Sequence, residues 1–99
     1  MTDLYAGIKI KKDYLGDCYE ICDNKYGFTL DENRAEIEYL LKNNYENIYN
    51  EKSNDGFPIY EHSRKAVEGF TQYKYGKSFQ NLLDELLSVD SDKYYFTIY

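Results

Sequence analysis

Apolar and other residues alternate at the start of the chain, which is the pattern of half-buried β-strands. Residues 4–10 read LYAGIKI and place an apolar side chain at every second position. After a break at Gly16, residues 18–24 (CYEICDN) repeat the alternation and end on turn-forming residues. We therefore predict two strands joined as a hairpin.

The closing residues, 94–99, also alternate, but neither face of the strand that they predict is conventionally polar. One face carries Tyr94, Phe96 and Ile98, and the other carries Tyr95, Thr97 and Tyr99. An extended strand with two such faces needs cover on both sides. The sequence does not say what covers the second face.

Residues 29–44 carry the spacing of an amphipathic helix. Thr29 or Asp31 would cap its start, Thr29 and Glu32 would form a capping box, and Asn43 and Asn44 would end it. The apolar stripe consists of Ile37, Leu40 and Leu41, and it would include Ile48 if residues 45–50 prolonged the helix.

Residues 78–90 give the clearest helical signal, with Ser78 as the expected cap. Large apolar side chains recur at helical spacing at Phe79, Leu82, Leu83, Leu86 and Leu87. Full burial of five such side chains would contribute on the order of 10 kcal/mol before conformational entropy is subtracted. This stripe must therefore meet the core.

Two segments between these helices are less regular. Residues 51–58 (EKSNDGFP) gather Ser, Asn, Asp, Gly and Pro and predict a loop. Residues 62–75 fit either a short helix or a strand, and Gly69 weakens both; we favour the short helix.

Together these segments predict one α+β domain over residues 1–99. We expect a small antiparallel sheet of about three or four strands, formed by the two ends of the chain and packed against two or three helices.

Tyrosine is unusually frequent, with 13 tyrosines beside 5 phenylalanines and no tryptophan. A buried tyrosine hydroxyl needs a hydrogen-bond partner. With 13 tyrosines in 99 residues, most of the rings must therefore lie at the boundary between core and solvent. Tyrosine is enriched in protein–protein contacts. A/T-rich codons are the alternative explanation.

The chain carries 12 basic and 18 acidic residues, a net charge of −6. This balance disfavours direct contact with nucleic acid or an anionic membrane and favours a basic protein as partner. The sequence shows no apolar segment long enough to span a bilayer and no secretory leader at Met1. We therefore expect its two cysteines to be reduced thiols in a cytoplasm.

No motif for catalysis, a metal or a cofactor is present. Cys18 and Cys22 with the single histidine, His62, fall short of the four ligands of a structural zinc site. Residues 60–64 (YEHSR) hold side chain types used in catalysis, but neighbours in sequence rarely converge on one point, so we interpret them as a surface turn or a helix start.

Short length, acidity, aromatic richness and the lack of a catalytic motif form a profile that resembles immunity proteins, antitoxins and anti-CRISPR proteins. By this analogy of profile we expect a non-enzymatic inhibitor that occludes a basic, nucleic-acid-handling protein such as a nuclease, in a bacterial or phage-infected cytoplasm. The expected steering charges are Glu32, Glu36 and Glu38, and the expected aromatic anchors are Tyr45, Tyr49, Tyr60, Tyr95 and Tyr99.

Two other hypotheses stay open. The second hypothesis is a structural or regulatory homodimer, in which the closing strand lies in mid-sheet or at an edge that pairs with its own copy. The third hypothesis is an enzyme without a familiar motif.

Overall fold

The computed structural model describes residues 4–12, 19–22, 26–30, 33–49 and 57–98. Within these residues lie three helices and seven strands, in the order β1 (Leu4–Gly7), β2 (Lys9–Lys12), β3 (Tyr19–Cys22), β4 (Tyr26–Phe28), α1 (Arg34–Asn43), β5 (Asn47–Tyr49), β6 (Ile59–Ser63), α2 (Arg64–Phe70), α3 (Lys77–Leu87) and β7 (Lys93–Ile98). The fold is α+β, as the sequence predicts.

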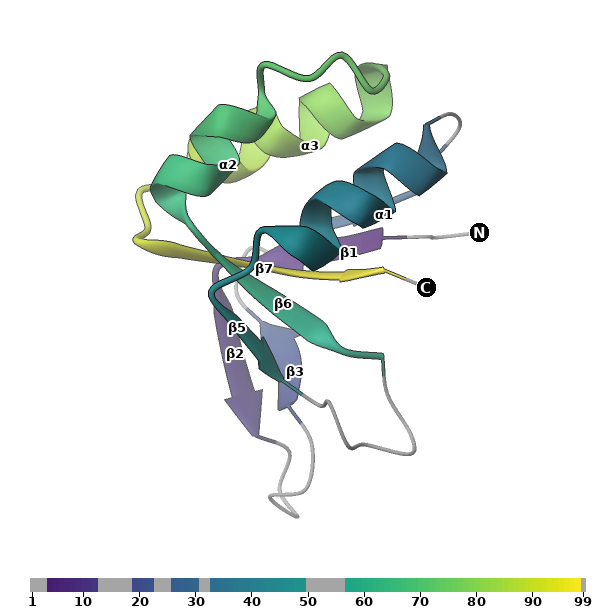
Figure 1. Ribbon diagram of the computed structural model, residues 1–99. Helices are drawn as coiled ribbons and strands as arrows, with labels where there is room; N and C mark the ends of the chain where they lie inside the picture. The colour runs from purple at the N-terminus through teal and green to yellow at the C-terminus, as the bar shows by residue number, and fades with distance from the viewer. Residues whose placement is uncertain (1–3, 13–18, 23–25, 31–32, 50–56, 99) are drawn as a thin grey trace.

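The main sheet is antiparallel, with the strand order β4-β1-β7-β6-β5. The closing strand β7 lies at its centre, where Phe96 pairs with Ala6 of β1 on one side and with Tyr60 of β6 on the other (Figure 1). The two ends of the chain thus pair in one sheet, as expected. The described part of this sheet has five strands rather than three or four.

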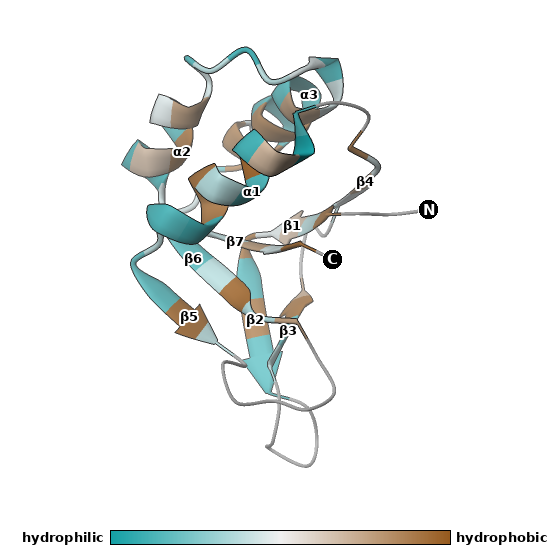
Figure 2. Cartoon of the chain, turned by 45° about the vertical axis from the view of Figure 1, so that its right-hand side comes forward, coloured by the Kyte–Doolittle hydropathy of each residue, from teal (hydrophilic) through white to brown (hydrophobic). Residues whose placement is uncertain are grey.

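The helices cover one face of the sheet, and their hydrophobic sides turn toward it (Figures 1 and 2). The predicted stripe of α3 meets the core: Phe79, Leu82, Leu83 and Leu86 are buried, and Leu87 is half-buried against the same core. The core between the layers also contains Leu4, Ile37, Leu40, Leu41, Val67, Phe70, Tyr94, Phe96 and Ile98. Among the described residues, no helix is both long enough and apolar enough to cross a bilayer.

The second face of the closing strand is covered from within the chain. The β2–β3 hairpin lies on the side of the sheet opposite the helices (Figure 1). Its Tyr19 ring lies 5.0 Å from the ring of Tyr49, which in turn lies 6.2 Å from that of Tyr95 on β7. Thr97, the next residue on this face, is 7% exposed and donates a hydrogen bond to the Pro58 carbonyl at 3.0 Å.

The predicted first strand divides at Ile8. Residues up to Gly7 pair with β4 and β7 in the main sheet, whereas Lys9 and the residues after it pair with β3 in a separate two-stranded sheet. The predicted hairpin is therefore confirmed for β2 and β3 but not for β1. One continuous alternation in the sequence serves two sheets because the chain bends at Ile8.

The helix boundaries correct several sequence expectations. Helix α1 begins at Arg34, and Asn33, with φ 59° and no side-chain cap hydrogen bond, holds the cap position in place of the expected Thr29. The other expected capping residues, Asp31 and Glu32, lie outside the described residues. The helix ends at Asn43, and within the expected extension over residues 45–50 the chain forms β5 at Asn47–Tyr49, with Ile48 on that strand. Helix α3 begins at Lys77 after Gly76, so Ser78 lies in its first turn and is not its cap.

The YEHSR segment is a strand that runs into a helix. Tyr60, Glu61 and His62 belong to β6 and are buried, so the expectation of a surface turn was wrong for them. Ser63 caps α2 by accepting a hydrogen bond from the Ala66 backbone N–H at 3.1 Å, so the expectation of a helix start is confirmed. Glu61 and His62 hide the β pattern in the sequence, because polar residues are not expected in a buried strand. Their hydrogen-bond partners come from distant segments, so the sequence gives no local sign of their burial.

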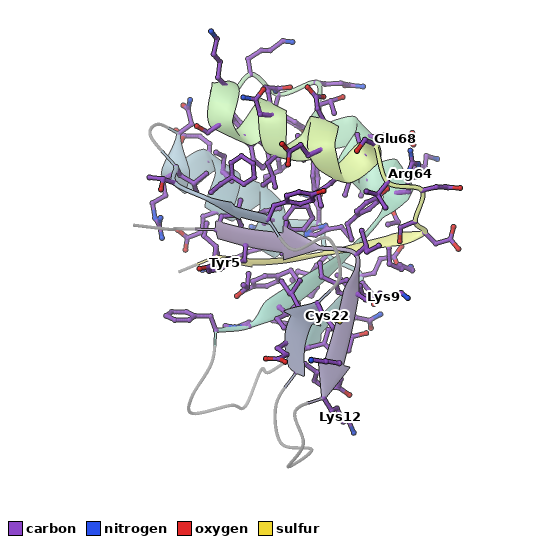
Figure 3. All side chains as sticks on the ribbon, turned by 180° about the vertical axis from the view of Figure 1, so that it is seen from behind. Tyr5, Lys9, Lys12, Cys22, Arg64 and Glu68 are labelled. Carbon is purple, nitrogen blue, oxygen red and sulfur yellow. The ribbon has the colours of Figure 1, made fainter. Side chains whose placement is uncertain are left out.

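Arg64, the first residue of α2, ties this helix to the end of α3. Its guanidinium donates to the carbonyls of Leu87 at 3.0 Å and Val89 at 3.1 Å, and to the hydroxyl of Tyr94. It also pairs at 3.1 Å with Glu68, one turn further along α2, and Figure 3 shows the two side chains close together. The positive charge therefore lies at the negative end of the α3 dipole.

Replacement of Arg64 by lysine is expected to lower the free energy of unfolding by about 1.5 kcal/mol. One ammonium cannot reach the two carbonyls and the hydroxyl that the planar guanidinium reaches together. Urea denaturation measures the change, with Lys65→Arg as the matched control on the exposed side of the same helix. A loss equal to that of the control would contradict the role assigned to Arg64.

Candidate functional site

The described tyrosines lie mostly at the boundary between core and solvent. Of these eleven, Tyr60 and Tyr94 are buried, whereas Tyr39 is 70%, Tyr73 45% and Tyr45 40% exposed. The other six are half-buried. The composition-based expectation is therefore confirmed for the part of the chain that the structure describes.

A groove of about 310 Å³ lies between α1 and α2, on the helical side of the molecule. It is lined by Leu40 and Asn44 from the C-terminal end of α1 and by Ala66, Gly69, Phe70, Gln72 and Tyr73 from α2 and the turn after it. No lining residue is charged. At its rim, the Tyr73 ring stacks on that of Tyr75, with 5.4 Å between centroids and 27° between planes.

Gly69 leaves the backbone of α2 uncovered in this groove. A methyl group at this position would meet no atom within 4 Å, and the backbone has no positive φ that would require glycine. Helix α2 therefore carries the conformational cost of a glycine that the packing of this chain does not need.

Replacement of Gly69 by alanine is expected to raise the free energy of unfolding by about 0.5–1 kcal/mol, the usual difference between these residues in a helix. Thermal and urea denaturation of the isolated protein measure it. A destabilised variant would show that the glycine is needed by the fold itself.

A cluster of polar side chains lies around the carboxylate of Glu61, on the face of the sheet opposite the helices. This residue is 5% exposed, and it accepts hydrogen bonds from the Asn47 amide at 2.8 Å, the Tyr49 hydroxyl at 2.9 Å and the Tyr95 hydroxyl. Burial raises the pKa of the Glu61 carboxyl, but these three donors outweigh burial and leave the pKa below its ordinary value. The carboxylate is therefore ionised and internally satisfied at neutral pH.

The tyrosines of this cluster are held as donors. Burial, followed by the hydrogen bond to Glu61, raises the pKa of Tyr95 to about 12 and raises that of Tyr49 in the same way. Both hydroxyls stay protonated at physiological pH. Two of the expected anchors thus meet at one carboxylate and serve the packing of the second face.

His62 is completely enclosed on the helical face. Its ring lies edge-on to Phe70 at 5.2 Å and Phe96 at 5.3 Å, and Nε2 lies 3.0 Å from the Leu41 carbonyl, to which it donates. Burial lowers its pKa to about 4, against weaker opposing effects of hydrogen bonds to backbone carbonyls. Among the described residues, Nδ1 has no hydrogen-bond partner. The ring is therefore neutral at pH 7 and has no surface exposed to solvent.

The other expected site residues do not gather with these. Glu36 is exposed on α1, and Glu38 pairs with Lys42 at 2.6 Å, a hydrogen bond that lowers the pKa of Glu38. Tyr60 is 7% exposed, with its ring 5.3 Å from that of Tyr45. The expected residues Glu32 and Tyr99 lie outside the described residues.

The acidity of the chain does not reside in the described residues. They contain ten Lys or Arg and ten Asp or Glu, whereas the whole chain contains 12 and 18. The net charge of −6 therefore comes from residues outside them. In the described part of the chain, no group of three or more His, Cys, Asp or Glu is placed to hold a metal ion, and Cys22 is a free thiol on the β2–β3 hairpin (Figure 3).

The α1–α2 groove is the feature that sequence reasoning missed. Its two walls come from segments far apart in the chain, which no local pattern connects. The one available signal was Gly69, an interior helix residue with poor helix propensity. No family model, no curated protein and no solved structure matches the chain, so its function has to be argued from this geometry.

Proposed function

We propose that the chain is a small non-enzymatic inhibitor that binds a basic protein, a nuclease or another nucleic-acid-handling protein, and occludes its working surface. The observation that carries this proposal is the uncharged groove between α1 and α2, with Tyr73 exposed in its lining and Tyr39 exposed on α1. Exposed aromatic rings beside a concave surface are typical anchors of protein–protein contacts.

The charge of the chain supports a basic partner. A net charge of −6 attracts a positively charged protein at long range, whereas the groove supplies uncharged contacts at short range. The first effect speeds association and the second slows dissociation. Such an inhibitor would act in the cytoplasm of a bacterial cell or a phage-infected host.

The polar clusters support a function without catalysis. Glu61 is occupied by three donors of the chain, and His62 is enclosed by Phe70, Phe96 and α1. A general acid or base has to reach the proton that it transfers. Neither of these buried groups has that access.

The homodimer hypothesis loses one of its routes. Both edges of β7 are hydrogen-bonded within the chain, to β1 and to β6, so the closing strand is unavailable for pairing with a second copy. A dimer through another surface remains an outcome of the experiment below.

The proposal is tested by measuring the association of the chain with a basic protein recovered from a bacterial lysate. We expect a binary complex whose association rate falls about tenfold or more between low and physiological salt, because screening weakens long-range attraction. Light scattering on the chain alone gives the control mass. A dimer as the only complex, or an association rate that is indifferent to salt, would contradict the proposal.

A further inference from the structure

We propose that the α1–α2 groove receives a single uncharged aromatic side chain from the partner protein, which packs directly on the α2 backbone at Gly69. This inference rests on the proposed function and names the chemistry that its groove would recognise.

The groove is uncharged although 30% of the residues in the chain are charged. Leu40, Ala66 and Phe70 form its apolar part, and a buried charge brought against them would lose its hydration without gaining a counter-ion. The lining therefore selects against lysine, arginine, aspartate and glutamate side chains. An uncharged side chain meets no such penalty.

The open backbone at Gly69 is an independent reason to expect close approach. Glycine is used where another group must come near the main chain. Here, apart from its chain neighbours and the backbone of its own helix, no atom of the described chain lies within 4 Å of the position that a methyl would take. A flat ring can rest on this uncovered turn of α2. Any larger residue at this position would fill the space.

The size and rim of the groove favour an aromatic ring over an aliphatic group. About 310 Å³ lies at the small end of ligand pockets, which suits one large side chain better than a cofactor. The Tyr73 ring, which stacks on that of Tyr75 outside the lining, offers an aromatic edge to the groove. The carboxamides of Asn44 and Gln72 offer polar groups to an indole N–H or a phenol hydroxyl.

The wall of the groove is held in place before binding. Phe70 is 4% exposed and contacts the His62 ring, which is itself fixed by its bond to the Leu41 carbonyl. Asn44 is held by its own hydrogen bond to the Leu40 carbonyl at 2.8 Å. A wall that does not rearrange avoids part of the entropic cost of binding.

The experiment titrates the isotope-labelled protein with N-acetyl-tryptophanamide, an uncharged aromatic probe, and follows backbone amide chemical shifts. We expect saturable shifts at Leu40, Gly69 and Tyr73 at probe concentrations on the order of millimolar. N-acetyl-lysinamide is the charged control probe and should leave these residues unshifted.

The variant Gly69→Val should weaken the aromatic probe at least tenfold, because its side chain occupies the space over the backbone. Thr71→Val is the matched control, since Thr71 follows α2 and does not line the groove. Far-UV circular dichroism checks that both variants fold, and Gly69→Ala, which adds only one methyl, should weaken the probe less.

Three results would overturn the inference. They are equal shifts with the lysine probe, no shift with the aromatic probe, and shifts at the same amides that depend on protein concentration alone, which would make a second copy the occupant. The titration needs no partner, so it can fail while the inhibitor proposal survives. Conversely, the groove can bind the probe when no basic partner exists, and then only the proposed function fails.

Discussion

Lowering the pH from 7 to 5 is expected to lower the free energy of unfolding by about 2 kcal/mol, through His62 alone. The pKa of this enclosed ring is about 4 in the folded protein, below the ordinary histidine value of 6.5 that applies to the unfolded chain. Between these two values the unfolded state binds more protons, so stability falls as the pH falls. The loss begins near pH 6.5 and levels off near pH 4.

Urea denaturation across this pH range measures the effect, with His62→Gln as the control. Glutamine can still donate to the Leu41 carbonyl but does not titrate, so the variant should lose most of the pH dependence above pH 5. The carboxylate of Glu61, which favours the charged imidazole and has a pKa below its ordinary value, stays ionised between pH 7 and 5. Parallel curves for the two proteins would contradict the neutral, buried state assigned to His62.

The double replacement Tyr49→Phe with Tyr95→Phe is expected to cost about 3 kcal/mol of stability, the largest effect that we predict for removing two atoms. Both hydroxyls donate to the buried Glu61 carboxylate, which would keep only the Asn47 amide. A charge that loses its donors but stays buried is far more costly than an exposed one. The pKa of Glu61 should rise in the variant.

The matched control removes two hydroxyls from the other side of the molecule, with Tyr39→Phe and Tyr73→Phe. These rings are 70% and 45% exposed, so the expected change is within about 0.5 kcal/mol. Urea denaturation at neutral pH compares the two doubles, and NMR titration of Glu61 gives its pKa. An equal loss of stability in the two double variants would contradict the hydrogen-bond network assigned to Glu61.

The elements with strong local periodicity were predictable from the sequence. The stripe from Phe79 to Leu86 on α3 and the alternation along β7 both follow from side chains that face one apolar layer. Strands β4 and β5 could not be predicted, because each has only three residues, which are too few to establish a period. In β4, one of the three is Gly27.

The polar part of the candidate site was beyond local patterns for a different reason. Glu61 and His62 look like surface residues in the sequence, and they are buried because Tyr49, Tyr95 and the Leu41 carbonyl reach them from other elements. The frequency of tyrosine correctly indicated rings at the boundary between core and solvent. It did not distinguish rings that serve internal packing from rings that face outward.

The structure divides the tyrosines into two groups that could not be distinguished in the sequence, those that pack inside the chain and those that are exposed. Tyr49 and Tyr95 contact Glu61 in the second face of the sheet, whereas Tyr39 and Tyr73 remain exposed on the helical side. The contact surface that we propose is therefore the helical side, around Gly69. Long-range attraction would come from the net charge of the whole chain, which the described residues do not contribute.

The most direct test of this account is a quantitative comparison of the proteins captured from a phage-infected bacterial lysate by the wild-type chain and by Gly69→Val. We expect the wild-type chain to enrich one basic, nucleic-acid-handling protein, and the variant to recover at least about tenfold less of it, a difference of about 1.4 kcal/mol in binding. Equal recovery by both proteins, or recovery of nothing but further copies of the chain, would contradict it.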